Sequence, residues 1–357
     1  MNRIFIFTPI CAFLITYFSI PVAIKVAKKY NIYEPDEFQK KYIQKISFLG
    51  GVGIFLGVFL AHGLLFPIGA SKPIYSHVLW LALFGTFLFG LGDDFFFYPP
   101  IKKFLSQFIF AAILILKSDL QLPLNELIPF LSSIPYSNLI FSIIIFSAIT
   151  NAFNLIDGID GLAGMLAVLA TSAYLYLFYK GESIYFFTLA LCGSGSLVAF
   201  LLYNRPSALV YMGGSGSSFI GMLIAVFTVI FISQGQSTLV NTDNRFQIGL
   251  ALIALPSMDM VRVFIFRIWR GDHPFKGDYN HIHHLLMNKG IGKKMTLLIV
   301  LGIHLTLVAI ALATLAYEAF LWFAVGATLF YISIIWYLKK VMIEKGREEQ
   351  VEVQASK

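Results

Sequence analysis

Two asparagines and two aspartates repeat at intervals of three residues between two apolar runs of the chain. The stretch NAFNLIDGID, residues 151–160, contains Asn151, Asn154, Asp157 and Asp160. On a helix this spacing would place all four side chains on one side. Carboxylates in apolar surroundings are costly unless they meet water, a cation or a ligand. The stretch therefore indicates a site for a metal ion, a nucleobase or a ribose. A polar seam between helices or a turn is the alternative, which fits less well because a seam rarely needs two carboxylates.

A second acidic cluster is the adjacent pair Asp93 and Asp94, within FGLGDDFFFYPP. Neighbouring carboxylates repel each other unless a cation lies nearby or one of them is protonated. Two interpretations stay open on this evidence. The pair is either solvated at a membrane surface or functional, and a functional pair could bind Mg²⁺ or supply a base beside it.

A glycine–serine loop, MGGSGS at residues 212–217, directly precedes another apolar run. N–H groups at the start of a helix favour a phosphate, although loops of this composition are often only connectors. The preceding stretch YNRPSALVY adds two suitable side chains. Arg205 could pair with a phosphate, and Tyr211 could stack on a base.

Three histidines, His281, His283 and His284, lie together in HIHH. Their spacing and the lack of accompanying cysteines argue against zinc. Near lysine and arginine they suit a diphosphate better, and interfacial histidines in a loop are the alternative. Upstream, Asp259 and Arg262 are predicted to form a buried ion pair with a structural or site-organising role.

The elements that must position these residues are membrane helices. The chain has 357 residues, of which 58% are hydrophobic and only 13% are charged, so it lacks the surface of a soluble domain. Its two cysteines suggest no disulfide framework. The fold class is therefore an all-α polytopic membrane protein. Eleven apolar stretches are candidate spans, or ten because the fourth and eighth are short. They are 4–27, 48–66, 74–92, 102–117, 137–154, 161–179, 184–203, 217–233, 247–268, 295–316 and 320–338.

The distribution of basic residues predicts the orientation. With the N-terminus outside and the C-terminus inside, most of the 26 lysines and arginines lie in inner segments. All four polar clusters then fall on the inner face, which predicts one site there. Nucleic-acid binding is disfavoured, because the basic residues are dispersed over loops. The net charge of +7 would also attract anionic lipid or phosphate.

The motifs GLGDD with KKFLSQ, NAFNLIDGIDGLAG, NRPSALVYMGGSGS and HIHHLLM, in this order, resemble the polyprenyl-phosphate N-acetylhexosamine-1-phosphate transferases. The resemblance runs through essentially the whole chain. It implies one integral membrane transferase domain over residues 1–357, with 339–357 as a cytoplasmic tail. It also implies a location in the inner or plasma membrane, an active site facing the cytoplasm and a homodimer. HIHHLL is more similar to the branch that uses UDP-N-acetylglucosamine. The phospho-muramoyl-pentapeptide branch is the alternative.

The implied reaction begins cell-envelope glycan synthesis. Polyprenyl phosphate, for example undecaprenyl phosphate, attacks a UDP-N-acetylhexosamine, giving polyprenyl-diphospho-sugar and UMP, with Mg²⁺ (or Mn²⁺) as cofactor. The resemblance assigns the site as follows. Catalytic residues are Asp93, Asp94, Asp157 and Asp160; substrate-binding residues are Asn151, Asn154, Asn204, Tyr211, His281, His283, His284, Lys102 and Lys103; metal positions are Asp93, Asp94 and Gly214.

One position departs from the family pattern. The family has Met-Gly-Asp-x-Gly-Ser where this chain has Met212-Gly213-Gly214-Ser215-Gly216-Ser217, and the missing aspartate is a principal Mg²⁺ ligand. Three explanations stay open: other aspartates compensate, the chain is a weakly active or non-catalytic binding relative, or the residue was altered to disable the enzyme. In the first inner loop, this chain has Tyr42 where the family has a histidine, and Ser47–Phe48 where the family has Pro-Arg. The resemblance assigns these family positions to recognition of the sugar or the lipid.

Overall fold

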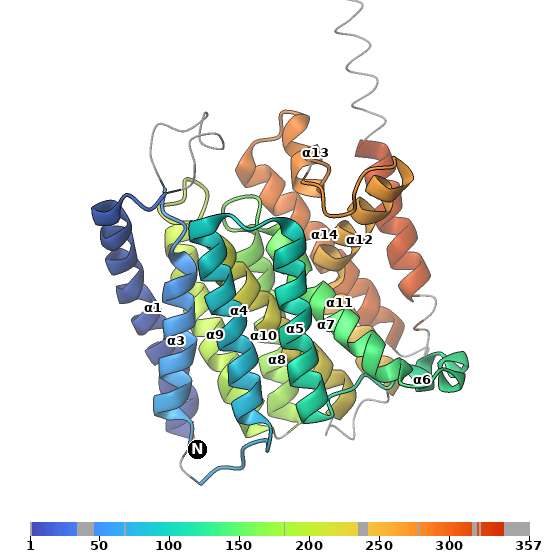
Figure 1. The fold of residues 1–357 in the computed structure, drawn as a ribbon, viewed down its shortest axis with the longest axis horizontal. Helices are drawn as coiled ribbons and strands as arrows, with labels where there is room; N and C mark the ends of the chain where they lie inside the picture. Colours follow the sequence, from blue (N-terminus) through green and yellow to red (C-terminus); the bar gives the residue numbers. More distant parts are fainter. Residues whose placement is uncertain are drawn as a thin grey trace, which may run out of the picture.

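The computed structural model describes residues 2–33, 46–67, 69–181, 183–234, 242–277, 279–315, 320 and 323–338, and over these ranges the chain is helical apart from its connections. The helices run roughly side by side (Figure 1). They are α1 (Asn2–Tyr30), α3 (Gly50–Leu65), α4 (Ser76–Phe96), α5 (Pro100–Ser118), α6 (Leu124–Leu127), η1 (Pro129–Ser133), α7 (Ser137–Ile156), α8 (Leu162–Lys180), α9 (Ile184–Asn204), α10 (Gly213–Gln234), α11 (Thr242–Leu252), α12 (Ala254–Trp269), α13 (Ile282–Asn288) and α14 (Lys293–Thr314). A further helix spans Phe323–Leu338.

Each predicted apolar stretch is helical over most of its described residues. Among those residues, seven helices are long and apolar enough to cross a membrane, and a bent pair makes eight. Two shorter apolar helices, Gly50–Leu65 and Phe323–Leu338, accompany them. The chain is therefore a polytopic membrane protein, whereas the number of eleven spans stays a prediction.

One predicted span is bent. The stretch 247–268 contains α11 and α12, which meet at an angle of 74° and are apolar enough to cross a membrane only when taken together as a bent pair. Pro256 lies in the first turn of α12. Proline has no N–H to donate, and its ring clashes with the carbonyl four residues earlier. A straight helix through residue 253 is therefore disfavoured, and the chain bends there.

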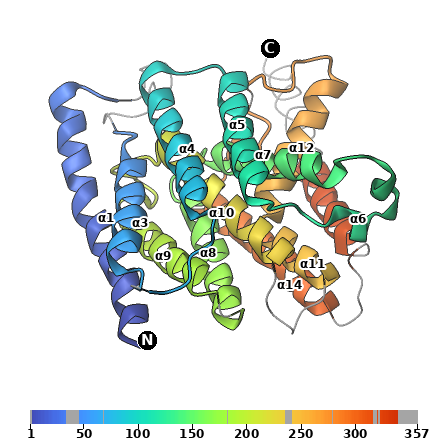
Figure 2. The ribbon, with the colours of Figure 1, turned by 60° about the horizontal axis from the view of Figure 1, so that its bottom comes forward.

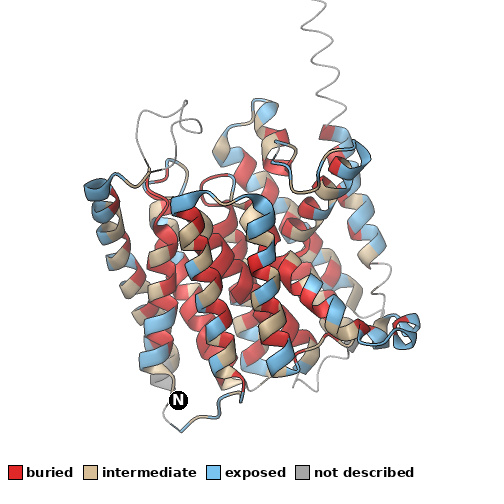
Figure 3. Ribbon diagram, viewed as in Figure 1, coloured by how far each residue is buried: buried red, intermediate tan, exposed pale blue. Residues whose placement is uncertain are grey.

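The core lies around α10, whose whole apolar window is buried. Figure 2 shows α10 among its neighbours and α11 beside α14, and Figure 3 shows buried residues concentrated in the middle of the bundle. Glycines allow this close packing. A Cβ on Gly90 of α4 would lie 2.4 Å from the Gly214 carbonyl oxygen, and one on Gly51 of α3 would lie 2.2 Å from the Gly216 nitrogen. Small residues let membrane helices approach at this distance, so the start of α10 is held against α3 and α4.

Candidate functional site

The end of α4 meets the first turn of α10 through Asp94. Its carboxylate accepts the N–H groups of Gly214 and Ser215 at 2.5 and 3.0 Å. A carboxylate in this position satisfies free N–H groups and complements the positive end of the helix dipole. Gly213, just before these donors, has a φ of +74°, and a Cβ there would lie 2.2 Å from the Phe48 carbonyl oxygen. Glycine is therefore required at 213 for this approach.

Asp93 faces the start of α5. Its carboxylate accepts the Tyr98 N–H at 2.8 Å, and its Oδ2 lies 2.7 Å from Lys103 Nζ. The Lys103 side chain is 30% exposed, so solvent screens part of this ion pair. Lys102, the other lysine expected near phosphate, is exposed. Of the two lysines, Lys103 is the one held at the carboxylate pair.

Position 214 opens directly onto the two carboxylates. A Cβ on Gly214 would lie 2.7 Å from Asp93 Oδ2 and 3.1 Å from Asp94 Oδ1. The φ of Gly214 is not in the left-handed region, and the nearest of these atoms ends a side chain that can shift. An aspartate at 214 would therefore place a third carboxylate beside the pair.

The asparagine-rich stretch joins the same end of α10. Asn154 on α7 donates from Nδ2 to Ser217 Oγ at 2.8 Å. The expectation that four polar side chains share one helix side is only half met. Helix α7 ends at Ile156, so Asp157 is its C-cap and Asp160 lies in the turn that follows. Gly161 in this turn has a φ of +83°, a conformation that glycine adopts readily.

Asp160 is held by several donors. Its carboxylate accepts the N–H groups of Ser207 and Ala208 at 3.3 and 3.4 Å. Lys293, at the start of α14, lies 3.2 Å from its Oδ2. Asp160 therefore joins the turn after α7 to the loop before α10 and to α14. Sequence reasoning missed Lys293, because this lysine belongs to no motif.

Asn204 and Tyr211 border the loop before α10. Asn204 is buried; its Oδ1 accepts the Gly161 N–H at 2.9 Å, and its Nδ2 donates to the Val210 carbonyl at 2.8 Å. The Tyr211 N–H donates to the Ser47 carbonyl at 2.8 Å, and the Tyr211 side chain is partly exposed. Asn204 thus fixes the loop, while Tyr211 keeps accessible surface for stacking.

His283 brings the fourth cluster to this end of the bundle. It is 1% exposed, and a Cβ on Gly158 would lie 2.1 Å from its Nε2, so the ring packs against the turn after α7. Neither ring nitrogen has a hydrogen-bond partner among the described residues. Burial, with an added effect of His284, lowers the pKa of His283 to about 3. His283 is therefore neutral at ordinary pH. His284 is partly exposed and packs against Tyr279.

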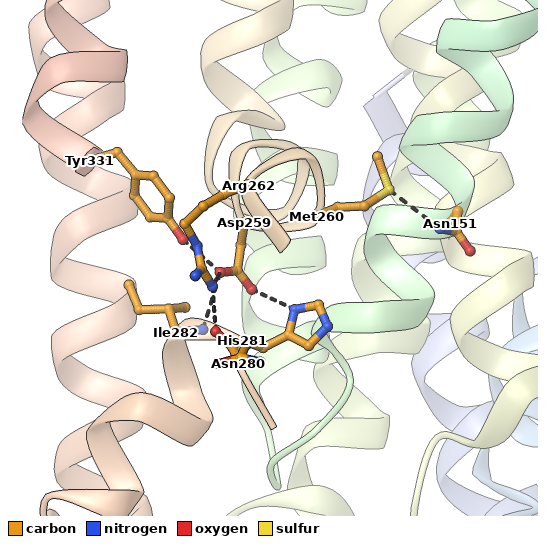
Figure 4. A network of polar contacts seen from close by, with 8 residues as sticks. All are labelled: Asn151, Asp259, Met260, Arg262, Asn280, His281, Ile282 and Tyr331. Carbon is orange, nitrogen blue, oxygen red and sulfur yellow. Dashed lines mark hydrogen bonds and ion pairs between the residues drawn. The ribbon is translucent and has the colours of Figure 1, made fainter. Parts of the chain in front are cut away.

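A dense polar network surrounds Asp259 on α12 (Figure 4). Its Oδ2 lies 2.7 Å from His281 Nδ1. Its Oδ1 accepts from Arg262 Nη2 at 2.8 Å, the Tyr331 hydroxyl at 2.6 Å and the Ile282 N–H at 3.1 Å. The predicted ion pair between Asp259 and Arg262 is confirmed. Sequence reasoning missed Tyr331, which is 72 residues away in a plain apolar run.

The remaining predicted residues lie at the edge of the candidate site or outside the residues that the structure describes. Asn151 donates to the Met260 sulfur at 3.3 Å (Figure 4), so it links α7 to α12. Tyr42, implied in sugar or lipid recognition, lies outside the described residues. Of the lone histidines in apolar runs, His62 and His304 are buried, whereas His77 is exposed.

The four clusters are joined by contacts, from Asp94 to Gly214, from Asn154 to Ser217 and from Gly158 to His283. Figure 1 places the turns that carry them at one end of the bundle. This end presents Lys103 beside paired carboxylates, one buried neutral imidazole and the amide of Asn154. Such a set can bind a phosphorylated nucleotide.

The donor set does not fit a complete Mg²⁺ site. No group of three candidate ligands from histidine, cysteine, aspartate and glutamate occurs within the part of the chain that the structure describes. Mg²⁺ prefers oxygen ligands in a strict octahedron. The two carboxylates of α4 face N–H donors and a lysine, and Gly214 offers no side-chain oxygen.

Comparison with known proteins gives a family and several relatives. The model of glycosyl transferase family 4 matches residues 76–232, a range that runs from α4 into α10 and contains three of the four clusters. An undecaprenyl-phosphate alpha-N-acetylglucosaminyl 1-phosphate transferase of Salmonella typhi is 29% identical over 304 residues, covering 82% of this chain and 78% of the relative.

Two further relatives extend the similarity to other bacteria. The protein of the same name from Escherichia coli strain K12 is 27% identical over 332 residues, 88% of this chain and 84% of the relative. A probable undecaprenyl-phosphate N-acetylglucosaminyl 1-phosphate transferase of Bacillus subtilis is 26% identical over 302 residues, 82% of this chain and 80% of the relative. The similarity thus extends over most of each chain.

Proposed function

We propose that this chain, whose residues 76–232 match the model of glycosyl transferase family 4, transfers N-acetylglucosamine 1-phosphate from UDP-N-acetylglucosamine to undecaprenyl phosphate. The names of the relatives support this donor and acceptor. The observation that carries the proposal is the set of contacts that joins the four polar clusters at one end of the bundle. A phosphoryl transfer needs donor and acceptor aligned in one place.

In the proposed reaction, an oxygen of the lipid phosphate forms a bond to the sugar-side phosphorus. The bond from that phosphorus to the bridging oxygen breaks, and UMP leaves with the electron pair. Asp93 and Lys103 would lie beside the lipid phosphate, and Asn154 and the histidine segment beside the nucleotide diphosphate. Tyr211 would stack on the uracil.

The membrane arrangement is part of the proposal. We place the N-terminus outside and the site at the cytoplasmic face of the inner or plasma membrane, since most basic residues then lie inside. A homodimer is proposed from the family resemblance.

Mg²⁺ (or Mn²⁺) is proposed as the cofactor, with a site completed only by a carboxylate at position 214. A cation there would neutralise the charge of the reacting phosphates. With Gly214, we expect weak cation binding by Asp93 and Asp94 alone. This expectation favours a second candidate function, in which the chain binds nucleotide and lipid without turnover.

Release of UMP tests both functions. The purified chain, Gly214→Asp and the uncharged control Gly214→Asn would be given UDP-N-acetylglucosamine, undecaprenyl phosphate and Mg²⁺. We expect Gly214→Asp to raise the rate on the order of 10²-fold, because it restores a metal ligand, and Gly214→Asn to leave it unchanged. UMP from none of the three would contradict the transferase. UDP-sugar binding without UMP would then support the second candidate.

A further inference from the structure

We propose that Asp259 is a positioning residue for His281. In this proposal the buried carboxylate holds the imidazole proton on Nδ1 and leaves Nε2 as the ring nitrogen that meets the substrate. The inference rests on the proposed function, since it assigns His281 to a site for a nucleotide diphosphate.

The hydrogen-bond network determines which nitrogen carries the proton. Asp259 Oδ1 accepts three donors, from Arg262, Tyr331 and Ile282. Arg262 is always charged and favours the ionised carboxylate. An ionised carboxylate can only accept, so the contact of 2.7 Å between Oδ2 and His281 Nδ1 requires a proton on Nδ1.

The same network clamps the main chain on both sides of His281. Asp259 accepts the N–H of Ile282, and Arg262 donates to the carbonyl of Asn280. Figure 4 shows the second ring nitrogen of His281 facing away from Asp259. The ring is parallel to that of His283, with 5.8 Å between centroids and 9° between planes, and His283 packs on the turn after α7. Nε2 thus has a fixed direction within the candidate site.

This arrangement predicts a specific effect of replacing the carboxylate by an amide. In Asp259→Asn, the amide oxygen would face the three donors and the amide NH₂ would face His281 Nδ1. An NH₂ group needs an acceptor, so the imidazole proton would move to Nε2. An amide in place of the aspartate of a catalytic triad likewise keeps the geometry but produces the wrong tautomer.

The tautomer can be measured by ¹⁵N NMR of histidine-labelled full chain in detergent micelles, with His281→Gln identifying the signal. We expect the native proton on Nδ1, Asp259→Asn to move it to Nε2, and the milder Tyr331→Phe to leave it on Nδ1. A native proton on Nε2, or no change in Asp259→Asn, would overturn the proposal. If Asp259→Asn does not fold, the spectra of the native chain and of Tyr331→Phe test the proposal. A proton on Nδ1 in both supports it, and a proton on Nε2 in the native chain overturns it. This measurement requires no turnover, so it is independent of whether the proposed reaction occurs.

The UMP assay gives a second, kinetic readout. Asp259→Asn should lower kcat on the order of 10²-fold, with KM for the UDP-sugar changed less than about 3-fold. In a His281→Gln background, Asp259→Asn should cause no further loss. Additive losses would show that Asp259 acts independently of His281 and would overturn the proposal. Absence of turnover in every chain would contradict the proposed function, while the spectra would still decide the role of Asp259.

Discussion

Two buried aspartates in this molecule are held in different ways. Asp94 accepts main-chain N–H groups at the start of α10, whereas Asp259 is bonded mainly by side chains, of Arg262 on its own helix and of His281 and Tyr331 farther along the chain. Main-chain donors leave the side-chain position beside them open, and here that position is Gly214. Side-chain donors fill the space around Asp259 and restrict what each neighbour can be.

Because of this difference, the two regions should respond differently to amino-acid substitutions. At Asp94, the backbone holds the geometry, so a substitution at 214 can alter the chemistry while the framework stays. At Asp259, the chemistry and the framework use the same side chains. The two regions should therefore differ in which substitutions damage the fold.

The largest effect is expected from Asp259→Ala. This change leaves Arg262, whose side chain is 13% exposed, without its carboxylate, and breaking such a pair costs about 3–5 kcal/mol. Equilibrium unfolding in mixed micelles would measure it. The matched control is Asp272→Ala, which breaks an exposed ion pair with Lys276 and should cost less than about 1 kcal/mol. Equal losses of unfolding free energy in Asp259→Ala and Asp272→Ala would show that the buried network around Asp259 is no more stabilising than the exposed ion pair.

A smaller effect is expected from Gly213→Ala in the first region. The left-handed conformation of residue 213 and the close Phe48 carbonyl disfavour any Cβ, and we expect destabilisation of about 2–3 kcal/mol. Gly214→Ala should cost less than about 1 kcal/mol, because the nearest atom there is the movable carboxylate of Asp93. The same unfolding measurement applies. A larger loss in Gly214→Ala than in Gly213→Ala would show that the backbone does not hold this region.

The smallest effect is a pH dependence from His283. Its pKa is about 3 in the fold and about 6.5 when unfolded, so stability is complete above pH 6.5 and is lost as the pH falls toward 3. Between pH 7 and pH 5 the loss should be about 2 kcal/mol. The variant His283→Gln cannot be protonated at this position. Its free energy of unfolding should therefore fall by about 2 kcal/mol less than that of the native chain between pH 7 and pH 5. An equal pH dependence in both chains would contradict this assignment.

Much of the helical framework could be predicted from apolar runs, because lipid-facing and core-facing positions are both hydrophobic. The bend between α11 and α12 could not, since hydropathy does not distinguish a straight span from a broken one; Pro256 was the only local signal. The proximity of Asp94 to Gly214 could be anticipated from the predicted orientation, which places both at inner helix ends.

The partners of individual side chains were less predictable. The ion pair between Asp259 and Arg262 follows from a spacing of three residues on a helix. Tyr331 and Lys293 could not be found in this way, because their contacts depend on the tertiary packing of helices far apart in sequence. Asn204 was expected to touch a ligand, yet both ends of its side chain bond the protein, a detail that residue type alone does not reveal.

The hydroxyl of Tyr331 has a consequence for biosynthesis. Ribosomes make the chain from the N-terminus, so Asp259 and His281 emerge well before helix Phe323–Leu338, whose Tyr331 supplies a donor to the carboxylate. A nascent protein truncated before residue 331 would contain every motif of the site but an incompletely bonded Asp259. Asp259 therefore gains its full set of donors only once helix Phe323–Leu338 has been made and packed, and a chain terminated earlier would have a less firmly anchored histidine.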